Sequence, residues 1–201
     1  MTADAQLREV LGRIDAANRA DPHTENEGGV EHPKELLYGR RMSGWLERLR
    51  PDAAPALRIA ARAQHLERWA IPRDRFPMGR TGYLRWRTTL GRHHAERTAE
   101  LMRAAGFDDD SIAAVAELLR KEGLARAAPD SDVQALEDCA CLVFLEHYLG
   151  PFAAKHPPAK VADILTRTWR KMSPAAREAA LTIRFRREVR ALLQAAGITS
   201  G

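Results

Sequence analysis

LEDCACLVFL, residues 136–145, is apolar on nearly every side when it forms a helix. A helix without a polar face lies in the interior of a protein, because all of its sides have to be removed from water. The helical pattern around this stretch runs from Asp130 to Leu149, and Gly150-Pro151 marks its end. We therefore expect a central, buried helix at residues 130–149, with the rest of the fold built around it.

Helical spacing of apolar residues also accounts for most of the remaining chain. The patterns predict about eight helices, at residues 2–20, 33–49, 55–69, 83–105, 110–123, 130–149, 158–172 and 174–197. Between them, residues 23–32 and 71–82 contain the glycines and prolines that are typical of loops. The sequence predicts no strand, internal repeat or low-complexity linker. The expected fold class is therefore all-α, a single-domain helical bundle that comprises residues 1–201.

The composition is that of an ordinary globular protein, with 201 residues of which 45% are apolar and 29% are charged. The first ten residues, MTADAQLREV, lack the basic and apolar regions of a signal peptide, and no stretch approaches the roughly twenty apolar residues that span a bilayer. Cys139 and Cys141 point about 200° apart on a helix and cannot bridge each other. Unbridged buried cysteines indicate a reducing compartment, so we expect a cytoplasmic protein without a membrane partner. The net charge of +5 is compatible with an anionic partner.

Two carboxylates, Glu137 and Asp138, stand at the buried end of the central helix. Carboxylates are rarely buried without a cation, hydrogen-bond donors or a metal ion, so other segments have to supply partners. Upstream, His65 lies on the third predicted helix, and His94 lies on the inward face of the fourth. We therefore predict Glu137 and Asp138 as catalytic residues. His65, His94 and Asp138 are predicted to hold a divalent metal ion.

Histidines on successive helices and an acid on a later one resemble the arrangement in HD-type metal phosphohydrolases. In that family, imidazoles and carboxylates hold metal ions that activate water against a phosphate ester. The sequence departs from the family's motif: residues 93–96 read HHAE without a His-Asp pair, and LEDCACL only loosely resembles the terminal Asp motif. These departures favour a purely structural alternative, in which His65 and His94 are hydrogen-bonded core histidines. Glu137 and Asp138 would then form ion pairs with arginines.

Arginines alternate with aromatic residues between residues 62 and 92. Guanidinium groups beside aromatic rings suit ligands that combine a phosphate or carboxylate with a planar group. We predict Arg73, Arg80 and Arg87 as ligand-binding residues. Lys121 is predicted to join them in holding phosphate oxygens. The alternative is a solvated arginine face whose aromatic residues pack into the core.

Four blocks of the sequence carry a resemblance to a known family: ELLYGRRMSGWLERL (35–49), RIAARAQHLERWAIPRDRFPMGRTGYLRWRTTLGRHHAE (58–96), LEDCACLVFLEHYL (136–149) and TWRKMS (168–173). They closely resemble the family known as domain of unknown function 4202, over nearly the whole chain. The resemblance implies an all-helical fold, and it implies no activity and no catalytic residue. The last block, at a helix end, is expected either to line the same cavity as the predicted site or to form a helix–helix contact.

The leading functional hypothesis is a metal-dependent hydrolase of a phosphorylated small molecule or nucleotide. The alternative is a non-catalytic helical module that binds an anionic ligand, an RNA segment or a protein partner through its arginine–aromatic surface. A nucleic-acid partner is the weaker version of this alternative, because the sequence has no recognisable RNA- or DNA-binding motif. A third hypothesis is a homo-oligomer, in which a second copy covers apolar helix faces.

Overall fold

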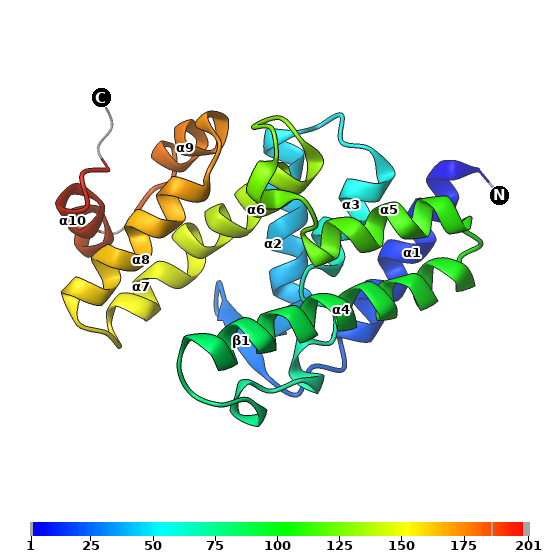
Figure 1. Cartoon of the computed structure of the whole chain (residues 1–201), viewed down its shortest axis with the longest axis horizontal. Helices are drawn as coiled ribbons and strands as arrows, with labels where there is room; N and C mark the ends of the chain where they lie inside the picture. The colour runs from blue at the N-terminus through cyan, green and yellow to red at the C-terminus, as the bar shows by residue number, and fades with distance from the viewer. Residues whose placement is uncertain (1, 186, 199–201) are drawn as a thin grey trace.

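The structure is a computed structural model, and it describes residues 2–185 and 187–198 of the chain. In this part of the chain, helices surround a buried centre, and a short hairpin packs beside the start of the second helix (Figure 1). The α-helices are α1 Ala3–Asn18, α2 Lys34–Leu49, α3 Pro55–Ala63, α4 Arg80–Ala104, α5 Asp109–Arg120, α6 Asp132–Val143, α7 Leu149–Ala153, α8 Pro158–Lys171, α9 Pro174–Leu181 and α10 Arg187–Ala195. None of these helices is both long and apolar enough to cross a membrane. The predicted all-α fold class is confirmed, with the hairpin as an addition to it.

The hairpin contradicts the prediction that residues 23–32 are a loop without strands. β1 Thr24–Glu27 pairs antiparallel with β2 Val30–Pro33. Gly28 and Gly29, which join the strands, both have positive φ, +61° and +88°, as a two-residue hairpin turn requires. The strands are mostly polar and exposed, so they lack the alternation of apolar and polar residues by which a strand is predicted from sequence.

The central helical segment continues beyond the end that the sequence predicts for it. After α6, one π-helical turn from Phe144 to Tyr148 leads directly into α7. Pro151 therefore lies inside a continuous helical segment, where it supplies no N–H to the carbonyl oxygen four residues earlier, that of His147. The Gly-Pro pair does not stop the chain from remaining helical as far as Ala153.

Two other predicted helices differ from the structure in extent. The helix predicted at 55–69 ends at Ala63, where α3 gives way to a turn. The helix predicted at 174–197 is divided into α9 and α10. At the end of α9 the hydroxyl of Thr182 donates to the carbonyl oxygen of Ala179, a local bond that competes with helical bonding. Because such bonds leave the spacing of apolar residues unchanged, the sequence pattern does not reveal these helix ends.

A cluster of buried apolar side chains runs through the structure, with α6 at its centre. This helix contacts α2, α3, α5, α8 and α9. Leu136, Cys139 and Leu142 on α6 are completely buried, which confirms the central helix that the sequence predicts. Cys139 and Cys141 are both buried free thiols, as expected, and burial raises the pKa of each to about 12.

The close packing of α2 on α3 predicts opposite effects of two glycine substitutions. A Cβ on Gly39 would lie 2.8 Å from the backbone carbonyl oxygen of Arg62, whereas a Cβ on Gly44 would have nothing within 4 Å. We expect Gly39→Ala to lower the free energy of unfolding by about 1–3 kcal/mol, because the two helices have to move apart. Gly44→Ala, on the same helix, should raise it by about 0.5–1 kcal/mol. Urea titrations of both variants measure these changes, and equal effects of the two substitutions contradict the prediction.

Candidate functional site

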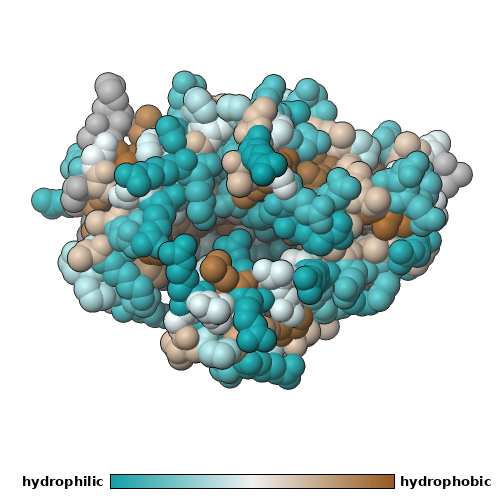
Figure 2. Space-filling view, viewed as in Figure 1, coloured by the Kyte–Doolittle hydropathy of each residue, from teal (hydrophilic) through white to brown (hydrophobic). Residues whose placement is uncertain are grey.

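A cavity of about 660 Å³ lies where six segments meet: α2, the turn after α3, α4, the end of α5, α6 and α8. Figure 2 shows a hollow, bordered mostly by hydrophilic residues, near the middle of the face on which α4, the end of α5 and α6 meet in Figure 1. Five of the residues predicted from the sequence line this cavity, namely His65, Arg87, His94, Lys121 and Glu137. Side chains that are far apart in the sequence are thus brought to one place.

His65 lies in the turn that follows α3. Its ring stacks on that of Tyr38 from α2, with 3.7 Å between the ring centroids and 10° between the planes. Its Nδ1 lies 3.0 Å from Oε2 of the buried Glu35, and a guanidinium nitrogen of Arg68 lies 3.0 Å from its Nε2. Glu67, with a φ of +51° in the left-handed region, shapes the turn. Both ring nitrogens of His65 are therefore engaged by the protein.

The surroundings of His65 determine its protonation. Burial lowers the pKa of His65 well below its ordinary value of 6.5, and the positive charges of Arg68 and Lys121 lower the pKa further. Burial raises the pKa of Glu35, against the attraction of Arg68. His65 is therefore neutral near pH 7. Its Nδ1–H donates to Glu35, and its Nε2 accepts a hydrogen bond from Arg68.

His94 lies on α4, and its ring centroid is 6.1 Å from that of His65. Its Nδ1 is 2.8 Å from the carbonyl oxygen of Leu66, so Nδ1 carries the proton and donates it to that oxygen. Burial, with the neighbouring His65, lowers the pKa of His94 to about 3. Its Nε2 makes no hydrogen bond to any residue that the structure describes. His94 thus places an unprotonated hydrogen-bond acceptor in the wall of the cavity.

Glu137 is the buried carboxylate of the cavity, and only 5% of the residue is exposed. Lys121 forms an ion pair with its Oε2, and Nζ of Lys171 lies 3.3 Å from its Oε1. Burial acts to raise the pKa of Glu137, but the attraction of the two lysines outweighs burial and the pKa is lowered. Lys121 itself has a φ of +55°, in the left-handed region, at the C-terminal end of α5. A backbone conformation that is unfavourable for lysine therefore directs an ammonium group into the cavity.

Asp138 has surroundings quite different from those of its neighbour Glu137. Its Oδ1 accepts hydrogen bonds from the backbone N–H of Ser173 and from the side chain of Gln134, both at 2.9 Å. Burial raises the pKa of Asp138, against these hydrogen bonds. Asp138 does not line the cavity, and it ties α6 to the start of α9. The structure thus separates Asp138 from the two histidines with which it is predicted to hold a metal ion.

Arg87 lines the cavity, but Arg73 and Arg80, also predicted to bind a ligand, do not. The guanidinium of Arg73 donates to the carbonyl oxygens of Phe76 and Pro77, at 2.8 and 3.0 Å, and so closes its own loop. Arg80 is exposed in the first turn of α4. The predicted ligand-binding arginines are thus divided between the cavity, the loop and the surface.

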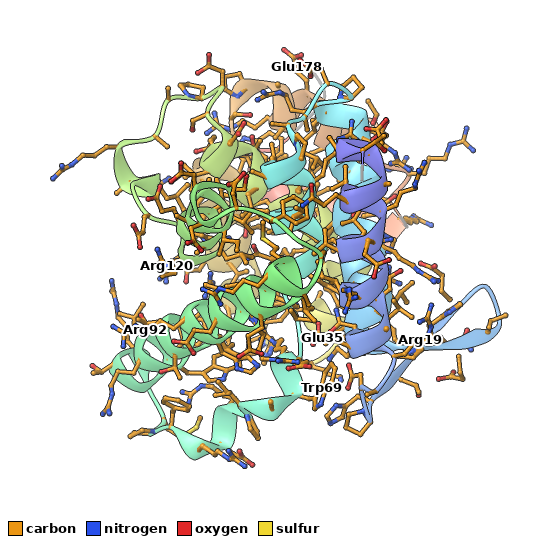
Figure 3. The ribbon with its side chains drawn as sticks, turned by 90° about the vertical axis from the view of Figure 1, so that its right-hand side faces the viewer. Arg19, Glu35, Trp69, Arg92, Arg120 and Glu178 are labelled. Atoms are coloured by element: carbon orange, nitrogen blue, oxygen red, sulfur yellow. The ribbon has the colours of Figure 1, made fainter. Side chains whose placement is uncertain are left out.

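Cationic side chains outnumber carboxylates around the cavity. The cations are Arg68, Arg87, Arg92, Arg120, Lys121 and Lys171, and the carboxylates are Glu122 and Glu137. Among the residues that the structure describes, Arg87 and Arg92 have no carboxylate at ion-pair distance. Figure 3 shows Glu35 in the interior and Arg92 and Arg120 at one margin, on α4 and α5. Even with Glu35 counted, cations are in excess, so the cavity has the positive potential that attracts an anion.

The side chains of the cavity do not fit a metal ion. In the described part of the chain, no group of three or more His, Cys, Asp or Glu side chains is arranged to hold one. Protein partners engage both nitrogens of His65 and both oxygens of Glu137, and the cations of the cavity repel another cation. The predicted divalent ion at His65, His94 and Asp138 therefore has no support from these contacts.

Glu35 and Tyr38 also belong to the site, although neither is among the residues predicted from the sequence. Both lie on the same face of α2 as the buried Met42. In the central helix, Glu137 and Asp138 are predicted as site residues because they stand among apolar residues. Glu35 likewise stands on an apolar face of α2, so the sequence does contain a signal that could have identified it. The TWRKMS block does line the cavity, through Thr168 and Lys171.

The ion pairs of Glu137 predict a pH dependence of stability. Because folding lowers its pKa, the stability that Glu137 contributes is fully present above its ordinary pKa of 4.5 and is lost as the pH falls through the lower folded value. We expect Glu137→Gln to lower the free energy of unfolding at pH 7 by about 1–3 kcal/mol, and to have less effect as the pH falls below 4.5. Urea titrations of both proteins at neutral and acidic pH test this. A difference between them that does not change with pH contradicts it.

Comparison with known proteins addresses the predicted family directly. A family model described as domain of unknown function (DUF4202) matches residues 8–193. No curated protein and no solved structure matches the chain. The similarity to HD-type phosphohydrolases therefore stays a prediction. The chain belongs to the family of domain of unknown function DUF4202.

Proposed function

We propose that this chain binds a phosphorylated small molecule in the central cavity. The observation that carries the proposal is the excess of cations over carboxylates in a cavity of about 660 Å³, a size typical of small-molecule sites. Guanidinium and ammonium groups form strong, charge-assisted hydrogen bonds with phosphate oxygens. A phosphate group offers several oxygens at once, so it suits cations that converge from α4, α5 and α8 better than a single carboxylate does.

Arg87 and Lys121 are the residues that we propose as the main contacts of the ligand. Arg87 is exposed on α4, and the hydroxyl oxygen of Tyr83 lies 3.4 Å from its guanidinium. Lys121 is more buried and is paired with Glu137. A bound phosphate would compete with that carboxylate for the ammonium group. The left-handed backbone of Lys121 supports this role, because strained residues are concentrated at binding sites.

Hydrolysis of a bound phosphate ester is a second candidate function. The observation that favours it is that His65, His94 and Glu137, grouped by the sequence analysis, line one cavity. Nε2 of the neutral His94 is a hydrogen-bond acceptor that would hold and orient the attacking water. No step is assigned to a metal ion, because the side chains do not fit one.

Two further predictions concern the setting in which the protein works. The buried free thiols of Cys139 and Cys141 support a reducing compartment such as the cytoplasm. An RNA segment is a weaker candidate ligand than a small molecule, because the cations converge on a cavity. Self-association also stays a prediction, and light scattering tests it.

Paired arginine variants test the proposed ligand site. Arg87 lines the cavity, whereas Arg85 is exposed on the same helix and does not line it. With pyrophosphate as the probe in titration calorimetry, we expect Arg87→Ala to weaken binding at least about tenfold, because a charge-assisted hydrogen bond is lost. Arg85→Ala should leave the affinity unchanged. Equal effects of the two variants, or no binding of pyrophosphate to the wild type, contradict the proposal.

Hydrolysis of p-nitrophenyl phosphate tests the second candidate function. If the protein is a hydrolase, we expect EDTA to leave its rate unchanged, since protein groups already engage both nitrogens of His65 and both oxygens of Glu137, and the residues described around the cavity offer no other set of metal ligands. His94→Asn should lower the rate by about 100-fold, because the acceptor that positions the attacking water is lost. A rate that EDTA abolishes and added manganese restores contradicts the prediction that hydrolysis at this site needs no metal ion. Such a result would support the metal-dependent hydrolase that the sequence predicts.

A further inference from the structure

His94 offers the cavity an acceptor that no described protein group satisfies, whereas the carboxylate of Glu137 is paired with lysines and the unpartnered amide of Gln64 can turn its NH2 group toward a ligand. Its Nδ1–H is committed to the carbonyl oxygen of Leu66, so the ring cannot turn its donor toward the cavity without breaking that bond. Nε2 therefore remains an acceptor, on a residue that is only 4% exposed and lines the cavity. When an anion displaces water from the cavity, this acceptor needs a ligand atom that carries a proton.

The groups around His94 keep Nε2 unprotonated. Burial lowers the pKa of His94 to about 3, and three neighbours add to the effect of burial. They are His93 on the same helix, whose ring centroid is 5.8 Å away, and His65 and Arg68 from the turn after α3. Protonating His94 to suit an anion without a proton is therefore costly, even though the anion itself favours the imidazolium form.

We propose that His94 makes the cavity selective for phosphate monoesters and inorganic phosphate over sulfate, sulfate esters and phosphodiesters. The inference rests on the proposed phosphate site and defines its ligand class more closely. A phosphate monoester loses its second proton near pH 6, so near neutral pH it still exists partly with a P–OH group. That hydroxyl donates to Nε2 of His94, while the remaining oxygens accept hydrogen bonds from the arginines and lysines.

Anions without a proton have no donor to offer to Nε2 of His94. A sulfate oxygen, or the unprotonated oxygen of a diester, would place a lone pair against the lone pair of Nε2. Leaving this acceptor without a donor, once the ligand has displaced water from it, weakens binding about 10- to 100-fold. The cations of the cavity attract phosphate and sulfate alike, so the discrimination between the two comes from the acceptor.

Methyl phosphate and methyl sulfate provide a test on the wild-type protein. At about pH 5.5 most of the methyl phosphate is a monoanion with one P–OH group, so the two probes have similar charge and size. His94 is still neutral at this pH, because its pKa is about 3. In titration calorimetry we expect methyl phosphate to bind at least about tenfold more tightly than methyl sulfate. Equal affinities overturn the inference.

Substitution of His94 assigns the selectivity to this residue. Asn preserves an N–H near the position of Nδ1, to donate to the carbonyl oxygen of Leu66, and has no counterpart of Nε2. We expect His94→Asn to bring the affinity ratio of the two probes close to one, mainly through weaker binding of methyl phosphate. His93→Asn is the matched control, because His93 is adjacent but does not line the cavity, and it should keep the wild-type ratio.

The outcomes separate this inference from the proposed function. Binding of both probes with the same affinity in the wild type, or a preference that persists in His94→Asn, overturns the selectivity and leaves an anion site in place. If neither probe binds to the wild type, the proposed phosphate site fails, and the selectivity fails with it. The comparison of probes on the wild type stands even if His94→Asn does not fold.

Discussion

The carboxylate of Glu137 is removed from water on the central helix, and two lysines compensate its charge. Lys121 comes from the end of α5 and Lys171 from the end of α8, so these two helix ends must meet beside α6. Removing one partner of such an ion pair costs about 1–3 kcal/mol, a sizeable part of the stability of a single domain. The ion pairs of Glu137 therefore constrain how three helices pack, and the cavity forms where they meet.

The electrostatics of the cavity follow from this arrangement together with the two histidines. Burial and nearby cations keep His65 and His94 neutral, so the positive charge of the cavity comes from arginine and lysine. Glu137 balances part of this charge from within, whereas Arg87 and Arg92 have no carboxylate partner among the described residues. The resulting positive potential is the property on which the proposed phosphate site rests.

Adjacent residues on one helix show how far the pattern of the sequence leads. Glu137 and Asp138 are both buried carboxylates on α6, as the apolar surroundings in LEDCACL predict. They project about 100° apart, since a helix turns by that angle at each residue. Glu137 therefore reaches the cavity, and Asp138 reaches the backbone of Ser173 at the start of α9. The helical period predicts that their directions differ, but what lies in each direction depends on how α5, α8 and α9 pack.

The histidines and arginines lead to the same conclusion. The predicted helices indicate His94, on an inward face, and His65, on the helix before it. The turn at Glu67, with its left-handed backbone, determines that His65 meets Glu35 and Arg68. No pattern of apolar residues records that turn. Arg73 lies in a segment of suitable composition, yet its guanidinium closes its own loop and does not reach the cavity. Composition predicts the kind of side chain in a region, and local hydrogen bonds decide where it points.

By itself, the sequence determined the helical fold class, the central helix and the presence of charges that need partners. These properties follow from the spacing of apolar residues, which every helix displays along its own length. Tertiary structure alone decided that His65, His94, Lys121 and Glu137 share one cavity, that Asp138 does not, and that cations prevail there. The physical reason is that ion pairs and hydrogen bonds between distant segments depend on distances of a few ångströms, which helix packing sets and local sequence does not encode.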